Sequence, residues 1–317
     1  MTDKQHVTFC ISDNYSSIVA VVLQSFVDHH TNESVFTFHI VSEAMSADNL
    51  AYLKRVIAQR SSWQLMYHPI EEKALAHIPT KYFTIHTWYR IFLDQLLPEE
   101  VERVLYLDAD TIIASSIDEL FQVPLENMAI GAAVDPQNFI SDTKQRIGLP
   151  QQHTYICAGV LLMNLSYWRE HNIAQQIIDW AIANAHRLVC PDQDAINVVL
   201  REKTVVLPAK WGVIARNFLH DAFCQTEEAA EAYHHPCIIH YAGNAPWYHE
   251  LSKIAPRFQE VWYETNQRME QPVEMRCYFN TIIKRLKALI RQIQGQLTYP
   301  SITSAFIEQK LQQFNRT

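Results

Sequence analysis

Short apolar runs that suit buried strands alternate along the chain with segments in which apolar residues recur at helical spacing. Strands are predicted at 6–12, 34–41 and 63–70, and helices at 14–30 and 46–60. Strands that alternate with helices indicate a mostly parallel sheet covered by helices on both faces. We therefore predict an α/β fold, which binds its ligands at the carboxyl ends of the strands.

The same alternation continues through the middle of the chain. The predicted elements are a helix ending before Pro98, strands at 104–107, 128–135 and 236–240, a strand running into a helix at 158–170, and a helix at 191–200. This pattern indicates one large domain over residues 1–268, followed by an extension of different composition over residues 269–317.

Two carboxylates, Asp108 and Asp110, follow the apolar run 104–107 directly. In a continuing strand, residues two apart point to the same side, so both carboxylates would face one point. Carboxylates that close repel one another unless a cation lies between them, and their oxygens suit Mg²⁺ or Mn²⁺. His240, at the end of another predicted strand, would complete such a site. The alternatives are an ordinary polar turn after a strand and a structural histidine.

A second polar group stands at the start of the helix predicted from residue 191. Asp192, Gln193 and Asp194 follow one another there. An aspartate at a helix start caps the backbone and complements the helix dipole. Capping explains one of these aspartates but not the whole triplet, so we expect a functional role for the rest.

Composition narrows the class of protein. The chain has 317 residues, of which 48% are hydrophobic, and a net charge of −8, so no general affinity for nucleic acid is expected. Six widely spaced cysteines without a CxxC pair predict free thiols in a reducing cytoplasm. We recognise neither a secretory signal nor an apolar run long enough to cross a membrane.

The extension is basic. Residues 275–307 hold five basic residues and no acidic residue, and apolar residues recur at helical spacing over 276–297. A basic amphipathic helix of this kind suits an anionic membrane surface. A helix that is docked on the core with a solvated basic face fits the pattern equally well.

The ordered motifs of the chain resemble those of glycosyltransferase family 8, the retaining transferases of the GT-A fold. The resemblance covers roughly residues 6–265 and is closest to bacterial lipopolysaccharide and lipooligosaccharide galactosyl- and glucosyltransferases. It rests on "SDNY", "TWYRIFL", "VLYLDADTII", "AAVD", "AGVLLMNLSYWRE", "DQDAIN" and "HYAGNAPW". It implies a catalytic domain at 1–268 with a mostly parallel central sheet flanked by helices, and a C-terminal helical appendage.

The resemblance also implies roles for single residues. Asp108, Asp110 and His240 would bind Mn²⁺ or Mg²⁺, which holds the diphosphate of a UDP-sugar donor. The other implied donor contacts are Cys10, Ser12, Asn14, Arg90, Ala109, Ala158, Gly159 and Gly243. The implied catalytic residues around the transferred hexose are Arg90, Asp135, Asp192 and Gln193. Because an amide is a poor nucleophile, Gln193 favours attack on the face from which the diphosphate leaves.

The chain departs from the family pattern at three points. "HYAGNAPW" is one residue shorter than usual and lacks a lysine that would contact the diphosphate, for which His249 or Lys253 could substitute. Cys157 stands where an asparagine is usual, which removes one strong sugar contact. Ser12 stands where an aspartate is frequent, which weakens the expected contact to uracil.

The hypothesis that follows is a metal-dependent retaining hexosyltransferase. It would move galactose or glucose from a UDP-sugar to a glycan or lipid-linked oligosaccharide, as a cytoplasmic enzyme on the inner face of the membrane. A catalytically degenerate relative that binds UDP-sugar or glycan at the membrane is the alternative. A nucleotidyltransferase ranks last, because "FCISDNYSS" has neither the glycine nor the lysine of a phosphate loop.

Overall fold

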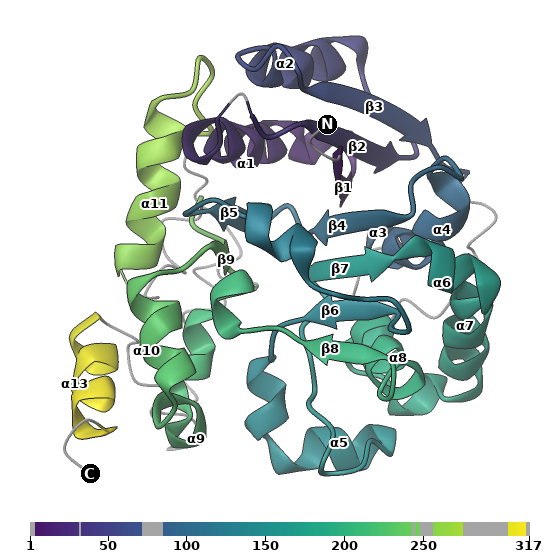
Figure 1. Ribbon diagram of the computed structural model, residues 1–317, viewed down its shortest axis with the longest axis vertical. Coiled ribbons are helices and arrows are strands. Elements are labelled where there is room, and N and C mark those ends of the chain that lie inside the picture. Colours follow the sequence, from purple (N-terminus) through teal and green to yellow (C-terminus); the bar gives the residue numbers. More distant parts are fainter. Residues whose placement is uncertain are drawn as a thin grey trace, which may run out of the picture.

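The computed structural model describes residues 4–31, 33–71, 85–242, 245–247, 256–274 and 304–314. Its main sheet has seven strands in the order β3-β2-β1-β4-β7-β6-β8 (Figure 1). The strands are β1 Gln5–Cys10, β2 Phe36–Ser42, β3 Gln64–Pro69, β4 Arg103–Leu107, β6 Ile130–Ala132, β7 Val160–Asn164 and β8 Thr204–Val206. Only β7 runs antiparallel to its neighbours, so the predicted mostly parallel sheet is confirmed.

A second, two-stranded sheet lies beside one end of the main sheet (Figure 1). It pairs β5, Thr111–Ile113, with β9, Ile238–His240, in antiparallel register. The register sets Thr111 opposite His240, although the two residues are far apart in the sequence. This pairing therefore places the end of β9 next to the turn that leaves β4.

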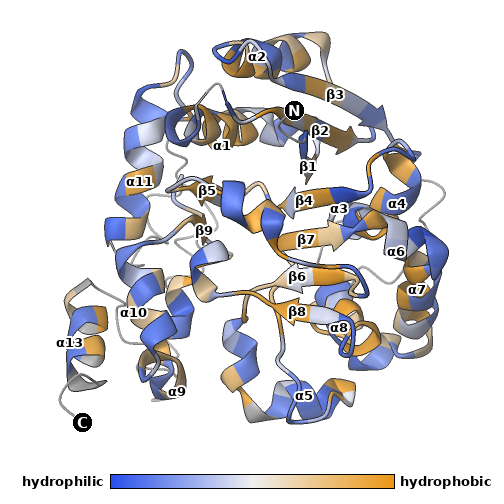
Figure 2. Ribbon diagram, viewed as in Figure 1, coloured by the Kyte–Doolittle hydropathy of each residue, from blue (hydrophilic) through white to orange (hydrophobic). Residues whose placement is uncertain are grey.

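Helices cover both faces of the main sheet, as the alternation of elements predicted. The helices are α1 Ser16–His29, α2 Ala47–Ile57, α3 His86–Tyr89, α4 Leu93–Leu96, α5 Ser141–Ile147, α6 Leu165–Glu170, α7 Ile173–Ala183, α8 Pro191–Val199, α9 Asp221–Cys224, α10 Glu227–His234, α11 Pro256–Gln267 and α13 Ser304–Phe314. Residues of α1 and α2 share one core cluster with β1 and β2, whereas α3, α4, α6, α7 and α8 contribute to a second. Hydrophobic residues run along α1, and α11 is largely hydrophilic (Figure 2).

Two predicted elements differ from the structure. The helix expected before Pro98 is interrupted by a tighter 3-10 turn at Arg90–Phe92, which separates α3 from α4. The strand expected to reach Asp135 ends at Ala132. Pro136 follows and has no amide hydrogen to donate to a sheet, and the Asp135 side chain caps the next turn by accepting from the amide of Gln137 at 2.8 Å.

The C-terminal extension is described only in part. The basic helix predicted at 276–297 lies outside the described residues. The side chains of Ile307 and Leu311, on α13, are buried in the core cluster that contains α1, and α13 contacts α9. No helix among the described residues is long and apolar enough to cross a membrane.

The predicted free thiols are confirmed where the structure describes them. Cys10, Cys157, Cys190, Cys224 and Cys237 are free, and Cys277 lies outside the described residues.

Candidate active site

The turn between β4 and β5 brings Asp108 and Asp110 together. Asp108 follows β4, and its amide still donates to the carbonyl of Gly159 at 2.8 Å, in continuation of the pairing with β7. The hydroxyl of Thr111 donates to the carbonyl of Asp108 at 2.8 Å and closes the turn. The two carboxylates converge as predicted, but for a different reason, since residues 108–110 form a turn and not an extended strand.

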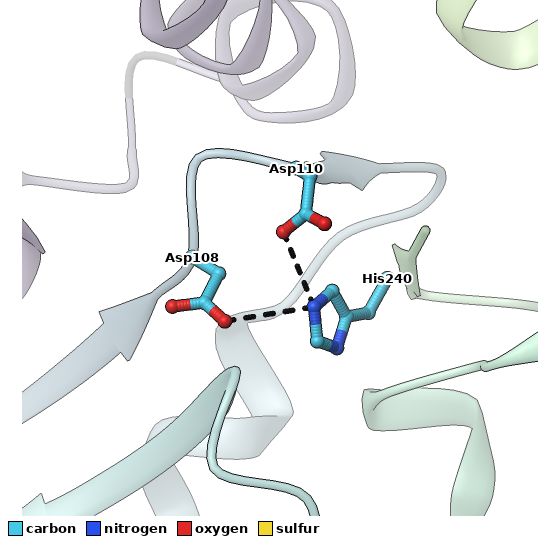
Figure 3. Close-up of side chains that lie close together, drawn as sticks. All are labelled: Asp108, Asp110 and His240. Carbon is cyan, nitrogen blue, oxygen red and sulfur yellow. Dashed lines mark ion pairs between the residues drawn. The ribbon is translucent and has the colours of Figure 1, made fainter. Parts of the chain in front are cut away.

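His240 reaches the two carboxylates from β9 (Figure 3). The amide of the next residue, Tyr241, donates to the carbonyl of Asp110 at 2.9 Å and holds the two segments together. Nε2 of His240 lies 3.2 Å from Oδ1 of Asp110 and 3.6 Å from Oδ2 of Asp108. Burial opposes the charged form of His240, but the neighbouring Cys157 and Asp110 outweigh it and raise its pKa well above the usual value.

This cluster fits a divalent cation. One ligand atom from each of Asp108, Asp110 and His240 lies within 4.8 Å of the others. Nε2 of His240 is buried and has no hydrogen-bond partner among the described residues, and it faces two carboxylates, an arrangement that a shared cation would satisfy. Two carboxylate oxygens and one imidazole nitrogen are a donor set that Mn²⁺ or Mg²⁺ accepts.

Cys157 and Gly159 form the surface against which the imidazole of His240 packs. Sγ of Cys157 lies 3.4 Å from Nδ1 of His240 and accepts a hydrogen bond from the amide of Gly159 at 3.4 Å. When Nδ1 carries the proton and faces sulfur, the Nε2 lone pair is left free for a metal. The thiol thus contacts the proposed metal ligand, a contact that the sequence did not indicate.

Asp108, Asp110 and His240 are called the metal cluster below. Arg90 connects this cluster to the helix α8. Its guanidinium forms an ion pair with Asp108 at 2.9 Å and with Asp192 at 3.3 Å. It also donates to the carbonyls of Thr87 and Ala158 and lies over the ring of Tyr106. Burial works against the Arg90 charge, yet Asp108, Tyr106 and Asp192 together raise its pKa above the ordinary value.

The start of α8 holds Gln193 in a fixed orientation. Oε1 of Gln193 accepts from the amide of Ala158 at 2.9 Å, and its Nε2 donates to the hydroxyl of Tyr155 at 3.2 Å. That hydroxyl donates in turn to Asp194 at 2.7 Å. Asp194 is fully buried, pairs with both terminal nitrogens of Arg146, and accepts from the amides of residues 189 and 190. Asp194 therefore has a structural role, because it fixes the segment that enters α8 and does not cap the first turn of the helix.

A cavity of about 680 Å³ lies beside the metal cluster, Arg90 and Gln193. The predicted site residues that line it are Cys10, Ser12, Arg90, Asp108, Ala109, Asp110, Asp135, Gln193 and His240. Burial raises the pKa of Asp135 and, against the pull of Arg90, that of Asp192. The carboxyl ends of β1 and β4 thus meet in one cavity, as expected for strands of such a sheet, and β9 of the second sheet adds His240 to it.

Four predicted site residues do not line the cavity. Asn14 is exposed outside it, whereas its neighbour Tyr15 lines it. Asp192 lies behind Arg90, and Ala158 and Gly159 act through their backbones and their packing. Gly243, His249 and Lys253 lie outside the described residues.

Sequence reasoning missed several residues of the cavity. Tyr106 donates a hydrogen bond to Oδ1 of Asp108, and strand alternation could have revealed it, because it stands two residues earlier. Arg216 comes from a segment with no motif in the sequence, and His86 stands one residue before the motif "TWYRIFL". Cys190 and Gln137 also line the cavity and contact each other at 3.5 Å.

Two known transferases are similar to this chain over most of its length. The chain is 25% identical over 260 residues to a lipopolysaccharide 1,3-galactosyltransferase of Salmonella typhimurium, which covers 78% of this chain and 74% of that relative. It is 22% identical over 254 residues to a lipopolysaccharide 1,2-glucosyltransferase of Escherichia coli. The aligned region covers 77% of this chain and 73% of that relative.

The fold also matches that of solved structures. A crystal structure of the galactosyltransferase LgtC in complex with donor and acceptor sugar analogs superposes with a TM-score of 0.73 at 22% identity, over 84% of this chain and 98% of that chain. This likeness confirms the predicted GT-A fold. The profile of glycosyl transferase family 8 matches residues 6–250, and the chain is therefore a member of glycosyltransferase family 8.

Proposed function

We propose that the chain is a metal-dependent retaining hexosyltransferase that moves galactose or glucose from a UDP-sugar to a lipopolysaccharide-type acceptor. The observation that carries this proposal is the cluster of Asp108, Asp110 and His240 at the wall of the cavity. The two lipopolysaccharide transferases named above support the class of acceptor.

The residues divide the chemistry between them. Asp108, Asp110 and His240 would hold Mn²⁺ or Mg²⁺, which neutralises the charge that develops on the leaving diphosphate. Ser12 and Cys10, at the end of β1, line the part of the cavity proposed for the nucleoside. Arg90 fixes Asp108 from behind, so the ligand geometry is preorganised before the donor binds.

Retention of the configuration at the anomeric carbon would follow if the acceptor attacks on the face from which the diphosphate departs. Gln193 lines the cavity but carries an amide, which is a poor nucleophile. Asp192 is paired with Arg90, and Asp194 is buried against Arg146 and does not line the cavity. Asp135 remains the carboxylate to test, and a glycosyl adduct found on it by mass spectrometry of the trapped enzyme would contradict same-face attack.

The acceptor is proposed to be a growing lipid-linked oligosaccharide on the cytoplasmic side of the membrane. The basic segment 276–297 would hold the enzyme at anionic lipids. The protein should then sediment with anionic vesicles at low salt and be released at high salt. Equal recovery with neutral and anionic vesicles would contradict this attachment.

The decisive experiment measures UDP release from a panel of UDP-sugars, with and without Mn²⁺. The double variant Asp108→Ala, Asp110→Ala serves as the blank, with its folding checked by circular dichroism. Release from one sugar that needs metal and is lost in the blank would establish the enzyme and identify the donor. Truncated lipopolysaccharide is then added, since transfer to it tests the acceptor.

The alternative is a relative that binds UDP-sugar or glycan without catalysis. It is motivated by Cys157, which replaces the usual asparagine, and by the absence of a lysine from "HYAGNAPW". Mn²⁺-dependent UDP binding, without release of UDP from any sugar in the presence of acceptor, would favour it over the hexosyltransferase.

A further inference from the structure

Three carboxylates and two guanidinium groups line the cavity. Asp108, Asp110 and Asp135 line it, whereas the arginines that line it are Arg90 and Arg216. A divalent cation on the metal cluster offsets two of the three carboxylates. A diphosphate that enters this space still needs a charged hydrogen-bond donor, because anions are strongly penalised in a partly buried site without one.

Arg90 is already committed to other partners. Its guanidinium is buried, forms ion pairs with Asp108 and Asp192, and donates to the carbonyls of Thr87 and Ala158. With Asp108 offset by the cation, Asp192 balances the single charge of Arg90, so Arg90 adds no net positive charge to the cavity. Its role is to fix the ligand Asp108 from behind.

Arg216 has the opposite surroundings. It lies in the short turn Ala215–Leu219, is exposed, and lines the same cavity. Within the described part of the chain, no carboxylate forms an ion pair with it. Its positive charge favours the ionised form of Asp135 and so opposes the effect of burial, which raises the pKa of that carboxyl group.

One contact ties Arg216 to the chain segment that follows His240. Its Nη2 donates to the carbonyl of Ala242 at 3.1 Å. Ala242 stands two residues after His240 and has a left-handed backbone, with φ at 46°. The contact ties the guanidinium to the segment that carries the metal ligand, and the remaining N–H groups of the planar fork are available to an anion.

We propose that Arg216 binds the diphosphate of the donor in the cavity that it shares with the metal cluster. This assignment rests on the proposed function, because it presumes a nucleoside diphosphate sugar in the cavity. A guanidinium can place two parallel N–H groups on phosphate oxygens, which makes it the better choice for this task than a single ammonium group.

The test compares UDP with uridine, which lacks the diphosphate. Titration calorimetry in Mn²⁺ measures both ligands on the wild type, Arg216→Ala and Arg216→Lys. Arg216→Ala should weaken UDP binding by about tenfold or more and leave uridine binding unchanged. Arg216→Lys should recover part of the loss. Arg201→Ala is the matched control, since Arg201 is also exposed and also donates to a backbone carbonyl, that of Val198.

Three results would overturn the proposal. If Arg216→Ala binds UDP as tightly as the wild type, another cation makes the contact to the diphosphate, and the proposed function stands. A loss of UDP affinity in Lys253→Ala would identify that cation. Equal losses for UDP and uridine would reduce Arg216 to a support of the Ala242 segment. A wild-type protein that binds no UDP with Mn²⁺ or Mg²⁺ would remove the proposed function itself.

Discussion

The backbone at Gly159 passes so close to the metal cluster that a side chain has no room. A Cβ atom there would lie 2.1 Å from Cε1 of His240 and 2.7 Å from Oδ2 of Asp108. Gly159→Ala should therefore displace His240 and weaken Mn²⁺ binding by about tenfold or more, the usual effect of disturbing the groups that orient a metal ligand. Calorimetry with Mn²⁺ in the presence of UDP measures this.

Gly131→Ala is the control for that substitution. Its added Cβ would meet the flexible end of Leu207 at 3.1 Å, and neither His240 nor Asp108 is among its nearest atoms. Gly131→Ala should keep the Mn²⁺ affinity of the wild type. Equal affinities in all three proteins would show that His240 does not bind the metal in the position described.

At the scale of the element, the buried ion pair of Arg146 and Asp194 holds the start of α8 in place. Arg146 and Asp194 lie 2.8 Å apart, with the Asp194 side chain fully buried. Asp194→Ala removes the partner of Arg146 and Tyr155 and the acceptor for two backbone amides, so we expect a loss of about 3 kcal/mol in the free energy of unfolding. Urea denaturation followed by circular dichroism measures the loss.

The surface pair of Lys210 and Glu231 is a matched comparison. Its atoms are also 2.8 Å apart, but the Glu231 side chain is 46% exposed. Glu231→Ala should cost less than about 1 kcal/mol, because solvent screens an exposed pair. Similar losses in the two variants would contradict the structural role given to Asp194.

A row of histidines crosses three neighbouring strands of the main sheet. Nδ1 of His6 lies 2.9 Å from Nε2 of His39, and Nδ1 of His39 lies 2.9 Å from Nε2 of His68. Burial, with the charges of His6 and His68, lowers the pKa of His39 to about 3. In the unfolded chain His39 binds a proton near pH 6.5, whereas in the folded chain it stays neutral down to about pH 3. The free energy of unfolding therefore falls as the pH drops from 6.5 toward 3.

We expect His39 alone to remove about 2 kcal/mol from the free energy of unfolding between pH 7 and pH 5. His39→Gln cannot take up that proton and should show a shallower pH dependence, whatever its stability at pH 7. Denaturation midpoints at pH 7, 6 and 5 compare the two slopes. Parallel slopes would mean that the row of histidines is not buried as described.

At the scale of the whole molecule, the sequence pattern predicted single strands and helices well, but it did not predict which distant segments pair with one another. The apolar runs placed β1, β2, β3 and β4 to within a few residues, because buried strands carry their signature in their own sequence. The register that sets Thr111 opposite His240 depends on two distant segments. The resemblance implied the three metal ligands, but the turn that joins the two aspartates, and the position of Arg216, are properties of the folded chain alone.

The differences between the predicted site residues and the residues that line the cavity have the same origin. Asn14 belongs to the motif but does not line the cavity, because the chain turns tightly at Asp13–Tyr15. Asp192 belongs to the triplet but is drawn behind the cavity wall by Arg90. A motif lists the residues that stand near a site, whereas the backbone at each position decides which side chain enters it.

We expect the helix α13 to contribute to the stability of the domain that precedes it. Ile307 is fully buried in the core cluster that contains α1, and the hydroxyl of Tyr233 on α10 donates to Glu308 at 3.3 Å. Ile307→Ala should lower the free energy of unfolding by about 3 kcal/mol through lost burial and a residual cavity, and the whole domain should still unfold in one transition.

Gln309 provides the control, because it is exposed on the same helix. Gln309→Ala should leave the free energy of unfolding within about 0.5 kcal/mol of the wild type. Urea denaturation of the two variants decides between two descriptions of α13. An Ile307→Ala protein as stable as the control would make α13 a separable appendage, whereas the expected loss makes it part of the core.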